Sequence, residues 1–141
     1  MFELYLNFWK QATDFKTRTN RGDYWAVMLI QTLVSICVAL AFFWWLPIID
    51  HIFSFASLLP MFAIGARRLH DIGISGWWQL LYILIIPIIV FVILYCFKSN
   101  EFTNKYGERT PETRNFILYF SINLIIGILL FLINVAYEGI K

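Results

Sequence analysis

One short stretch of the sequence gathers the side chains best able to bind a charged group. It runs from a pair of arginines to a pair of tryptophans and contains Arg67, Arg68, His70, Asp71, Trp77 and Trp78. If a helix continues through residue 71, then Arg67, His70 and Asp71 stand at i, i+3 and i+4 and share one face. The stretch follows an apolar run, where charged groups are costly unless they are paired or hydrated. We therefore treat it as the candidate functional site.

The sequence leaves three interpretations of this cluster open. In the first the cluster is structural: Arg67 pairs with Asp71, Arg68 extends to lipid phosphate, and the tryptophans anchor the next span. In the second, Arg67 and Arg68 bind an anionic headgroup or a ligand phosphate through paired hydrogen bonds from their guanidinium groups. Two basic residues of the N-terminal segment, Arg18 and Arg21, join them in this binding interpretation.

The third interpretation assigns His70 and Asp71 to metal binding or proton transfer. The other histidine, His51, lies 19 residues earlier. A continuous helix would therefore separate the two imidazoles by roughly 28 Å at about 1.5 Å per residue. One chain does not easily place both on one metal ion, so His70 with Asp71 is the candidate metal pair. Because the sequence holds neither a GxSxG motif nor a phosphate-binding glycine loop, we expect no catalytic activity and no cofactor.

The composition indicates that the elements carrying this cluster lie in a membrane. Of the 141 residues, 60% are hydrophobic and 14% are charged, and the mean hydropathy is +0.71. Soluble domains are usually about half apolar and about a quarter charged. The formal net charge of +2 is too small to indicate a nucleic-acid-binding protein. The sequence therefore predicts an all-α integral membrane protein whose partners are lipids, another membrane protein or further copies of itself.

Four apolar runs are candidate transmembrane helices, because a helix needs roughly 20 apolar residues to cross the hydrocarbon core. The predicted spans are residues 24–46, 49–66, 77–97 and 113–137. They form one membrane domain over 24–137, which an amphipathic and basic segment over 1–23 precedes. Apolar residues in that segment recur at helical spacing, which predicts an N-terminal helix lying in the membrane interface.

The Lys and Arg residues predict an orientation through the positive-inside rule. With four spans, seven of them fall on the side of the N-terminal segment, the second loop and the C-terminal tail, against four in the loop over 98–114. This count predicts that both termini lie in the cytoplasm.

The same residues resemble the signature of the domain of unknown function 805 family, which comprises small bacterial inner-membrane proteins. The stretch from Arg67 to Trp78 carries the most specific part of that resemblance, and 104–107 matches an N-x-[YF]-G motif. Residues 15–25 are similar to an F-x-G-R-x-x-R-x-x-Y-W motif, with Thr17 in place of the glycine. The resemblance covers roughly residues 8–110, so the fourth span lies beyond it. It implies a fold and a bacterial inner-membrane location, and it supplies no established activity.

Together these observations predict a small component of the cell envelope whose Arg, His, Asp and Trp cluster binds anionic lipid or a membrane partner on the cytoplasmic side. Two other functions stay open. One is an oligomeric channel or carrier for an ion or small solute, and the other is a metal-dependent membrane enzyme acting on lipid phosphates.

Overall fold

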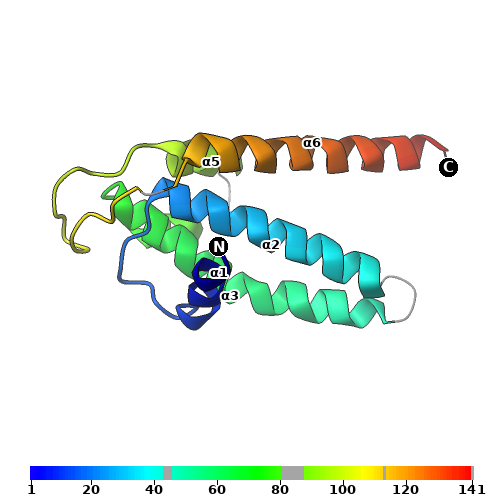
Figure 1. The fold of residues 1–141 in the computed structure, drawn as a ribbon, viewed down its shortest axis with the longest axis horizontal. Helices are drawn as coiled ribbons and strands as arrows, with labels where there is room; N and C mark the ends of the chain where they lie inside the picture. The colour runs from blue at the N-terminus through cyan, green and yellow to red at the C-terminus, as the bar shows by residue number, and fades with distance from the viewer. Residues whose placement is uncertain (43–45, 81–87, 113, 141) are drawn as a thin grey trace.

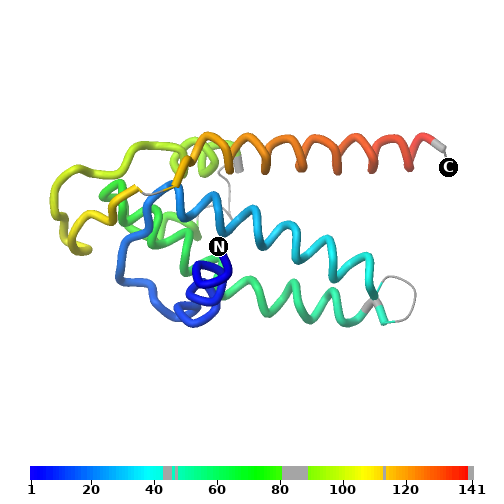
Figure 2. The backbone as a smooth tube through the Cα atoms, viewed as in Figure 1, coloured from blue at the N-terminus to red at the C-terminus, as the bar shows by residue number. Residues whose placement is uncertain are grey.

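The computed structural model describes residues 1–42, 46–80, 88–112 and 114–140. These residues fold into helices joined by loops (Figures 1 and 2), with one isolated bridge and no strand. The helices are α1 (Phe2–Lys10), α2 (Arg21–Phe42), α3 (Pro47–Asp71), the short 3-10 helix η1 (Gly76–Gln79), α5 (Ile88–Cys96) and α6 (Phe116–Ile140). The all-α prediction is confirmed for the described part of the chain.

Three helices are long and apolar enough to cross a membrane: Arg21–Phe42 in α2, Ile48–Asp71 in α3 and Phe116–Gly139 in α6. At about 1.5 Å per residue, each exceeds the roughly 30 Å of a hydrocarbon core. They correspond to the predicted spans 24–46, 49–66 and 113–137, of which residues 43–45 and 113 lie outside the described part. The second is longer than predicted, because α3 continues to Asp71 and includes Arg67, Arg68 and His70 of the candidate cluster.

The third predicted span, residues 77–97, is not confirmed as a single crossing of the membrane by the described residues. Its first residues belong to η1 and its last to α5, whose 9 residues rise only about 14 Å. The Tyr95 hydroxyl donates to Gln79 Oε1 at 3.3 Å, so the start and the end of the segment lie close together. Residues 81–87 lie outside the described part. The segment has the hydropathy of a span, but both its ends lie at one end of the molecule.

The long helices run along one another, and the loops gather at one end of the molecule (Figure 1). α2 and α3 form an antiparallel hairpin, and α6 runs beside the first part of α2 in the same direction before the two helices separate. The connector 11–20, the end of α3 and the loop 97–115 lie together at what we call the loop end. The C-terminal end of α2, the first turn of α3 and the C-terminal end of α6 lie at the opposite end.

The loop over 98–114 lies against the N-terminal segment, which contradicts its predicted place across the membrane. Asn20 Nδ2 donates to the Pro111 carbonyl at 3.0 Å, and Arg21 pairs with Glu112 at 2.7 Å. Groups on opposite faces of a hydrocarbon core about 30 Å thick cannot make such contacts. The arrangement therefore gives no support to the prediction that both termini lie on the same side.

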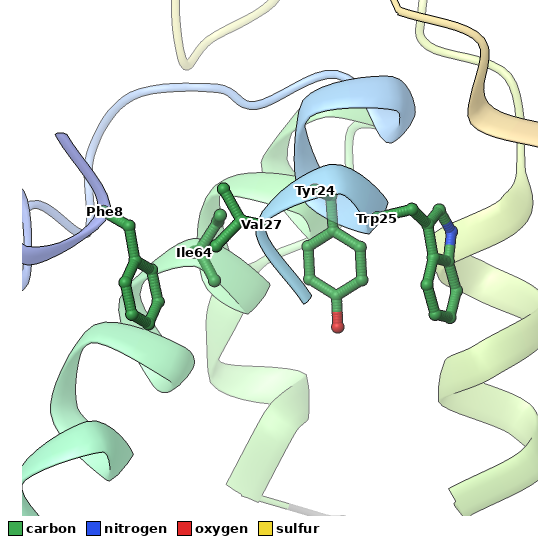
Figure 3. Packing of buried hydrophobic residues seen from close by; sticks show 5 residues of the cluster. All are labelled: Phe8, Tyr24, Trp25, Val27 and Ile64. Carbon is green, nitrogen blue, oxygen red and sulfur yellow. The ribbon is translucent and has the colours of Figure 1, made fainter. Parts of the chain in front are cut away.

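A small aromatic core joins α1 to the hairpin (Figure 3). Its buried side chains are Phe8, Tyr24, Trp25, Val27 and Ile64. Figure 1 views α1 along its axis and the long helices from the side, so α1 crosses them at a steep angle. The Tyr5 hydroxyl donates to Gln31 Oε1 at 2.8 Å, and the ring centroids of Trp9 and Phe53 are 6.1 Å apart. The N-terminal segment thus contains the predicted helix, and its apolar side packs on the hairpin.

Labelling of single cysteines with a membrane-impermeant maleimide tests this arrangement. In a variant with Cys37 and Cys96 replaced by serine, we expect Lys16→Cys and Lys105→Cys to react from the same side of the membrane. Glu138→Cys, near the end of α6, should react from the other side. All three native side chains are exposed, so labelling of positions 16 and 105 from different sides would contradict the structure.

Candidate functional site

α3 ends at Asp71, within the predicted cluster, and a hydrogen-bonded turn that contains glycine follows it. Gly73 has a φ of 85°, which a residue with a side chain rarely adopts. The Gly73 amide donates to the His70 carbonyl at 3.0 Å. The Ile74 amide donates to the Leu69 carbonyl at 2.9 Å. These two bonds form a Schellman motif, which satisfies carbonyls of the last helical turn and ends the helix.

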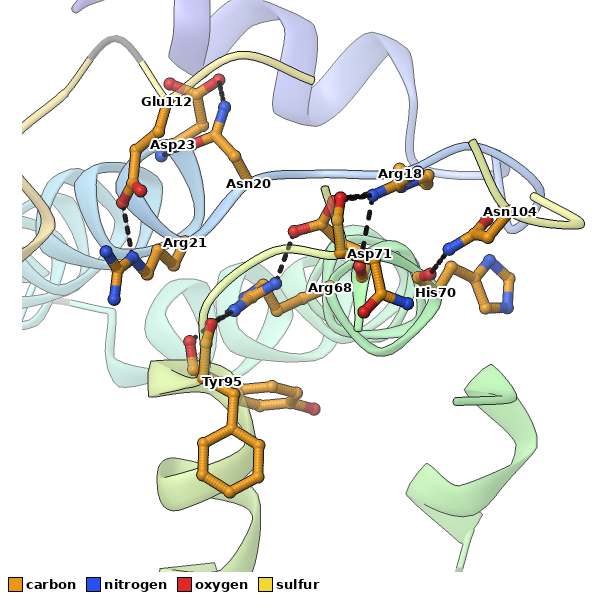
Figure 4. Close-up of polar contacts among 12 residues, drawn as sticks. Arg18, Asn20, Arg21, Asp23, Arg68, His70, Asp71, Tyr95, Asn104 and Glu112 are labelled. Atoms are coloured by element: carbon orange, nitrogen blue, oxygen red, sulfur yellow. Dashed lines mark hydrogen bonds and ion pairs between the residues drawn. The ribbon is translucent and has the colours of Figure 1, made fainter. Parts of the chain in front are cut away.

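Asp71, the last residue of α3, is held between two arginines (Figure 4). Arg18 Nε donates to Asp71 Oδ1 at 3.1 Å, and Arg68 Nη1 lies 2.6 Å from Oδ2. All three side chains are at most 1% exposed. Their charges sum to +1, and buried charges are tolerated only when they are paired and their hydrogen-bonding groups are satisfied. The carboxylate therefore joins the connector before α2 to the end of α3.

The other N–H groups of the two guanidinium groups donate to main-chain carbonyls. The acceptors are those of Asn100 (3.0 Å), Gly107 (3.0 Å), Phe102 (3.2 Å) and Asp71 (3.3 Å) for Arg18, and those of Tyr95 (3.1 Å) and Phe97 for Arg68. The carbonyl dipoles offset the excess positive charge of the cluster. Two arginines thus hold the loop after α5 in place.

The pairing of Arg67 with Asp71 is wrong. Arg67 Nη1 instead donates to Gln11 Oε1 on the connector after α1, and its Nε has no partner among the described residues. The extension of Arg68 to lipid phosphate is wrong as well, because its side chain is 0% exposed and bonded to Asp71. Residues three or four apart can both make contact on a helix. Of the two possible pairs, the one that forms is Arg68 with Asp71, at i and i+3.

His70 faces the connector and the loop rather than Asp71. Its Nδ1 lies 3.3 Å from the Thr17 carbonyl, and its ring stacks on Tyr106 with centroids 3.7 Å apart. A ring nitrogen beside a carbonyl carries the proton, which leaves Nε2 of a neutral ring as an acceptor. His70 and Asp71, the predicted metal pair, thus turn to different partners. The described residues hold no group of three His, Cys, Asp or Glu side chains placed to bind a metal ion.

Arg21, the fourth arginine of the predicted site, belongs to a second set of contacts. It pairs with Glu112 at 2.7 Å, and its guanidinium carbon lies 4.0 Å from the centroid of the Phe116 ring. Arg114 pairs with Asp23 beside it. These partly exposed pairs fasten the start of α6 to the start of α2.

The connector before α2 has a hydrogen-bonded turn of its own at Asp14. The Thr17 hydroxyl donates to Asp14 Oδ2 at 2.6 Å and the Lys16 amide to Oδ1 at 2.9 Å. Burial raises the pKa of the Asp14 carboxyl, but these bonds and the Arg67 charge outweigh it, so the pKa lies below its ordinary value. The carboxylate therefore stabilises the turn at neutral pH, and this contribution is lost as the pH falls through the lowered pKa. Thr17, at the position of the motif glycine, makes this turn.

A cavity of about 430 Å³ lies beside His70. It is lined by Phe15, Phe62, Ala66, His70, Gly76, Trp77, Gln79 and Leu80. Gly76 lets η1 approach α3 closely, since a Cβ there would stand 2.7 Å from the Ala66 Cβ and 3.2 Å from His70 Nε2. Trp77 and Trp78 are 78% and 52% exposed. The wall of the cavity is thus largely apolar, with an imidazole in it and exposed tryptophans beside it.

The fold and the site define a class: a helical membrane protein in which the arginine, histidine and aspartate side chains of the signature, Arg67, Arg68, His70 and Asp71, are buried. The chain belongs to the family described as protein of unknown function (DUF805), whose model matches residues 12–108. It is 32% identical over 108 residues to the inner membrane protein YhaI of Escherichia coli (strain K12), a match that covers 74% of this chain and 92% of that relative. It is 30% identical over 113 residues to the inner membrane protein YhaH of the same organism, with coverage of 73% and 92%. No solved structure matches the chain.

Several residues that contact the cluster are not predicted from the sequence. Gln11 accepts from Arg67, and no local pattern marks it. Asn104 Nδ2 donates to the His70 carbonyl at 2.9 Å, and Tyr106 stacks on the His70 ring. Both residues lie in the N-x-[YF]-G motif, which was the available signal that the loop meets the end of α3.

We expect Asp71→Asn to destabilise the protein strongly, because it leaves two buried guanidinium groups without a counter-ion. Removing one partner of a buried ion pair typically costs about 3–5 kcal/mol. Thermal unfolding of the purified protein in detergent measures the loss. The matched control is Asp50→Asn, in the first turn of α3 and only partly buried, which should lower the melting temperature far less. Equal shifts for the two variants would contradict the structural role of the cluster.

Proposed function

We propose that this protein is a non-catalytic component of the bacterial inner membrane that binds an anionic phospholipid headgroup at its loop end, on the cytoplasmic side. The distribution of positive charge carries this proposal. Of the 11 Lys and Arg residues, nine lie in the loop end or, for Arg21, next to it: Lys16, Arg18, Arg21, Arg67, Arg68, Lys98, Lys105, Arg109 and Arg114. Lys10 is the last residue of α1, and Lys141 lies outside the described part. The positive-inside rule assigns such an end to the cytoplasm.

This orientation changes the predicted position of the C-terminus. α6 begins at the loop end and runs to the opposite end (Figure 1). Its C-terminus then lies in the periplasm, whereas the count of basic residues over four spans predicts the cytoplasm.

The buried arginines are not the groups that we assign to the headgroup. Arg18 and Arg68 are bonded within the protein, and Arg21 is paired with Glu112. Their role is to hold the connector, the loop and α6 in place around the cavity. Binding of a phosphate falls to the basic side chains that remain exposed.

Two exposed lysines flank the cavity. Lys16 follows Phe15, which lines it. Lys105 Nζ lies 4.9 Å from the centroid of the Tyr106 ring, which stacks on His70. Each basic residue near an anionic leaflet contributes about 1 kcal/mol of attraction. A phosphate at the mouth of the cavity would therefore interact with both ammonium groups.

The exposed tryptophans favour a site at the level of the headgroups. Trp77 is mostly exposed and Trp78 is about half exposed. Indole rings prefer the membrane–water interface. Trp77 also lines the apolar cavity, which suits the glycerol and upper chain region of a lipid. The other two functions, a channel or carrier and a metal-dependent enzyme on lipid phosphates, stay predictions from the sequence.

Native mass spectrometry of the protein with added lipid tests the proposal. We expect phosphatidylglycerol to be retained in preference to phosphatidylcholine. Lys16→Gln combined with Lys105→Gln should weaken phosphatidylglycerol binding by roughly 10- to 30-fold, because two attractions of about 1 kcal/mol are lost. Binding of phosphatidylcholine should change little.

A pair of aromatic substitutions supplies the control. Trp77→Ala should reduce retention of phosphatidylglycerol, whereas Phe102→Ala should not, since Phe102 is 83% exposed at the same end and lies away from the cavity wall. Equal retention of the two lipids by the unmodified protein, or equal effects of the two aromatic variants, would remove the proposed site.

A further inference from the structure

α6 is far more exposed than the other two long helices. The share of its apolar window that is buried is 0%, against 28% for α2 and for α3. Its first turns pack on the start of α2. The Phe120 ring centroid lies 4.8 Å from that of Trp25, and Asn123 Nδ2 donates to the Trp25 carbonyl at 3.1 Å.

The side of α6 that faces α2 continues beyond this contact as a regular stripe. Its next members after Asn123 are Gly127, Leu130 and Asn134, at i+4, i+7 and i+11, which is the heptad spacing of a helix–helix seam. A Cβ added at Gly127 would meet no heavy atom within 4 Å. This shows that α2 and α6, which diverge along their length (Figure 1), have separated at Gly127. The stripe on α6 therefore continues beyond the point at which α2 packs against it.

Asn134 gives this unpartnered part of the seam a polar group. Its side chain is exposed on an otherwise apolar helix, and the described residues give its carboxamide no hydrogen bond. A carboxamide that faces lipid is unfavourable, and polar side chains within spans usually hydrogen-bond across helices. Gly127, two turns earlier on the same stripe, lets a second backbone come close.

We propose that a second copy of this chain packs on the Gly127, Leu130 and Asn134 stripe, forming a symmetric dimer in the membrane. A carboxamide is self-complementary, since it carries both a donor and an acceptor. A partner must present its own polar group at the same depth in the bilayer. A second copy related by a two-fold axis along the membrane normal does so for Asn134 and for Gly127 at once.

The stripe on α6 lies outside the part of the chain that matches the family model. The family model ends at residue 108, and α6 begins at Phe116. YhaI is matched over 92% of its length by 108 residues, which leaves too few residues in it for a helix of 25. The proposed dimer contact is thus independent of the headgroup site, which lies within the part that these relatives share.

Förster transfer between labelled copies in liposomes, measured over a range of protein-to-lipid ratios, tests the dimer. Gly127→Leu and Asn134→Leu should each weaken dimerisation, Asn134→Leu by roughly 3- to 20-fold, as expected from losing one hydrogen bond between spans. Ser121→Leu is the matched control, because Ser121 is a small exposed residue on the opposite side of α6. Since α6 packs only through its first turns, none of these variants should lower the melting temperature.

Cysteine cross-linking gives a second, independent measurement. In a variant with Cys37 and Cys96 replaced by serine, Asn134→Cys should form a disulfide-linked dimer in membranes, and Leu132→Cys on the opposite side should not. A monomer at every protein-to-lipid ratio overturns the proposal. A dimer that all three leucine variants leave unchanged, or cross-links from position 134 to a different protein, overturns it as well.

Discussion

The structure depends on one carboxylate that is shared by two buried arginines. Asp71 accepts from Arg18, 53 residues away in the sequence, and from Arg68, one turn earlier on α3. One negative charge cannot balance two positive ones, so the guanidinium groups also need the carbonyls of the loop after α5. Each part is favourable only when the others are present, because a buried guanidinium without partners carries a large desolvation cost. The connector, the end of α3 and the loop must therefore become ordered together, which explains why the three motifs that resemble the family meet at one place.

Hydropathy predicts the long helices well, and it fails where the ends of a segment decide the topology. α2, α3 and α6 lie close to their predicted spans because the length of an apolar run directly reflects the thickness of the hydrocarbon core. Residues 77–97 pass the same test, yet Gln79 and Tyr95 bond to each other. A window of hydropathy measures how apolar a segment is and contains nothing about where its ends lie. A crossing at residues 77–97 would place the basic loop over 98–114 on the opposite side of the membrane from Asn20 and Arg21, which the loop contacts.

The candidate site was predictable in its composition and not in its pairing. Spacing on a helix identifies Arg67 and Arg68 equally well as partners of Asp71, and it does not show which of them turns inward. Contacts with residues distant in the sequence decide which arginine pairs with Asp71. Arg67 donates to Gln11, whereas Arg68 donates to main-chain carbonyls at the end of α5 and in the loop after it. Every residue carries a main-chain carbonyl, so the sequence does not indicate which carbonyls of the loop accept hydrogen bonds from Arg18 and Arg68. Trp77 and Trp78, which the sequence suggests as anchors at the membrane interface, are 78% and 52% exposed.

The same physics explains how α6, which lies beyond the family match, is attached to the rest of the protein. Between helices in lipid, apolar packing alone gives little driving force, since lipid tails are as apolar as leucine. α6 is accordingly attached by polar contacts, in which Glu112, Arg114 and Asn123 from beyond the family match bond to the start of α2. These contacts lie in its first turns and in the loop before them. Further along α6, Asn134 is exposed on an apolar helix, and a second membrane helix would supply its carboxamide with a hydrogen-bond partner.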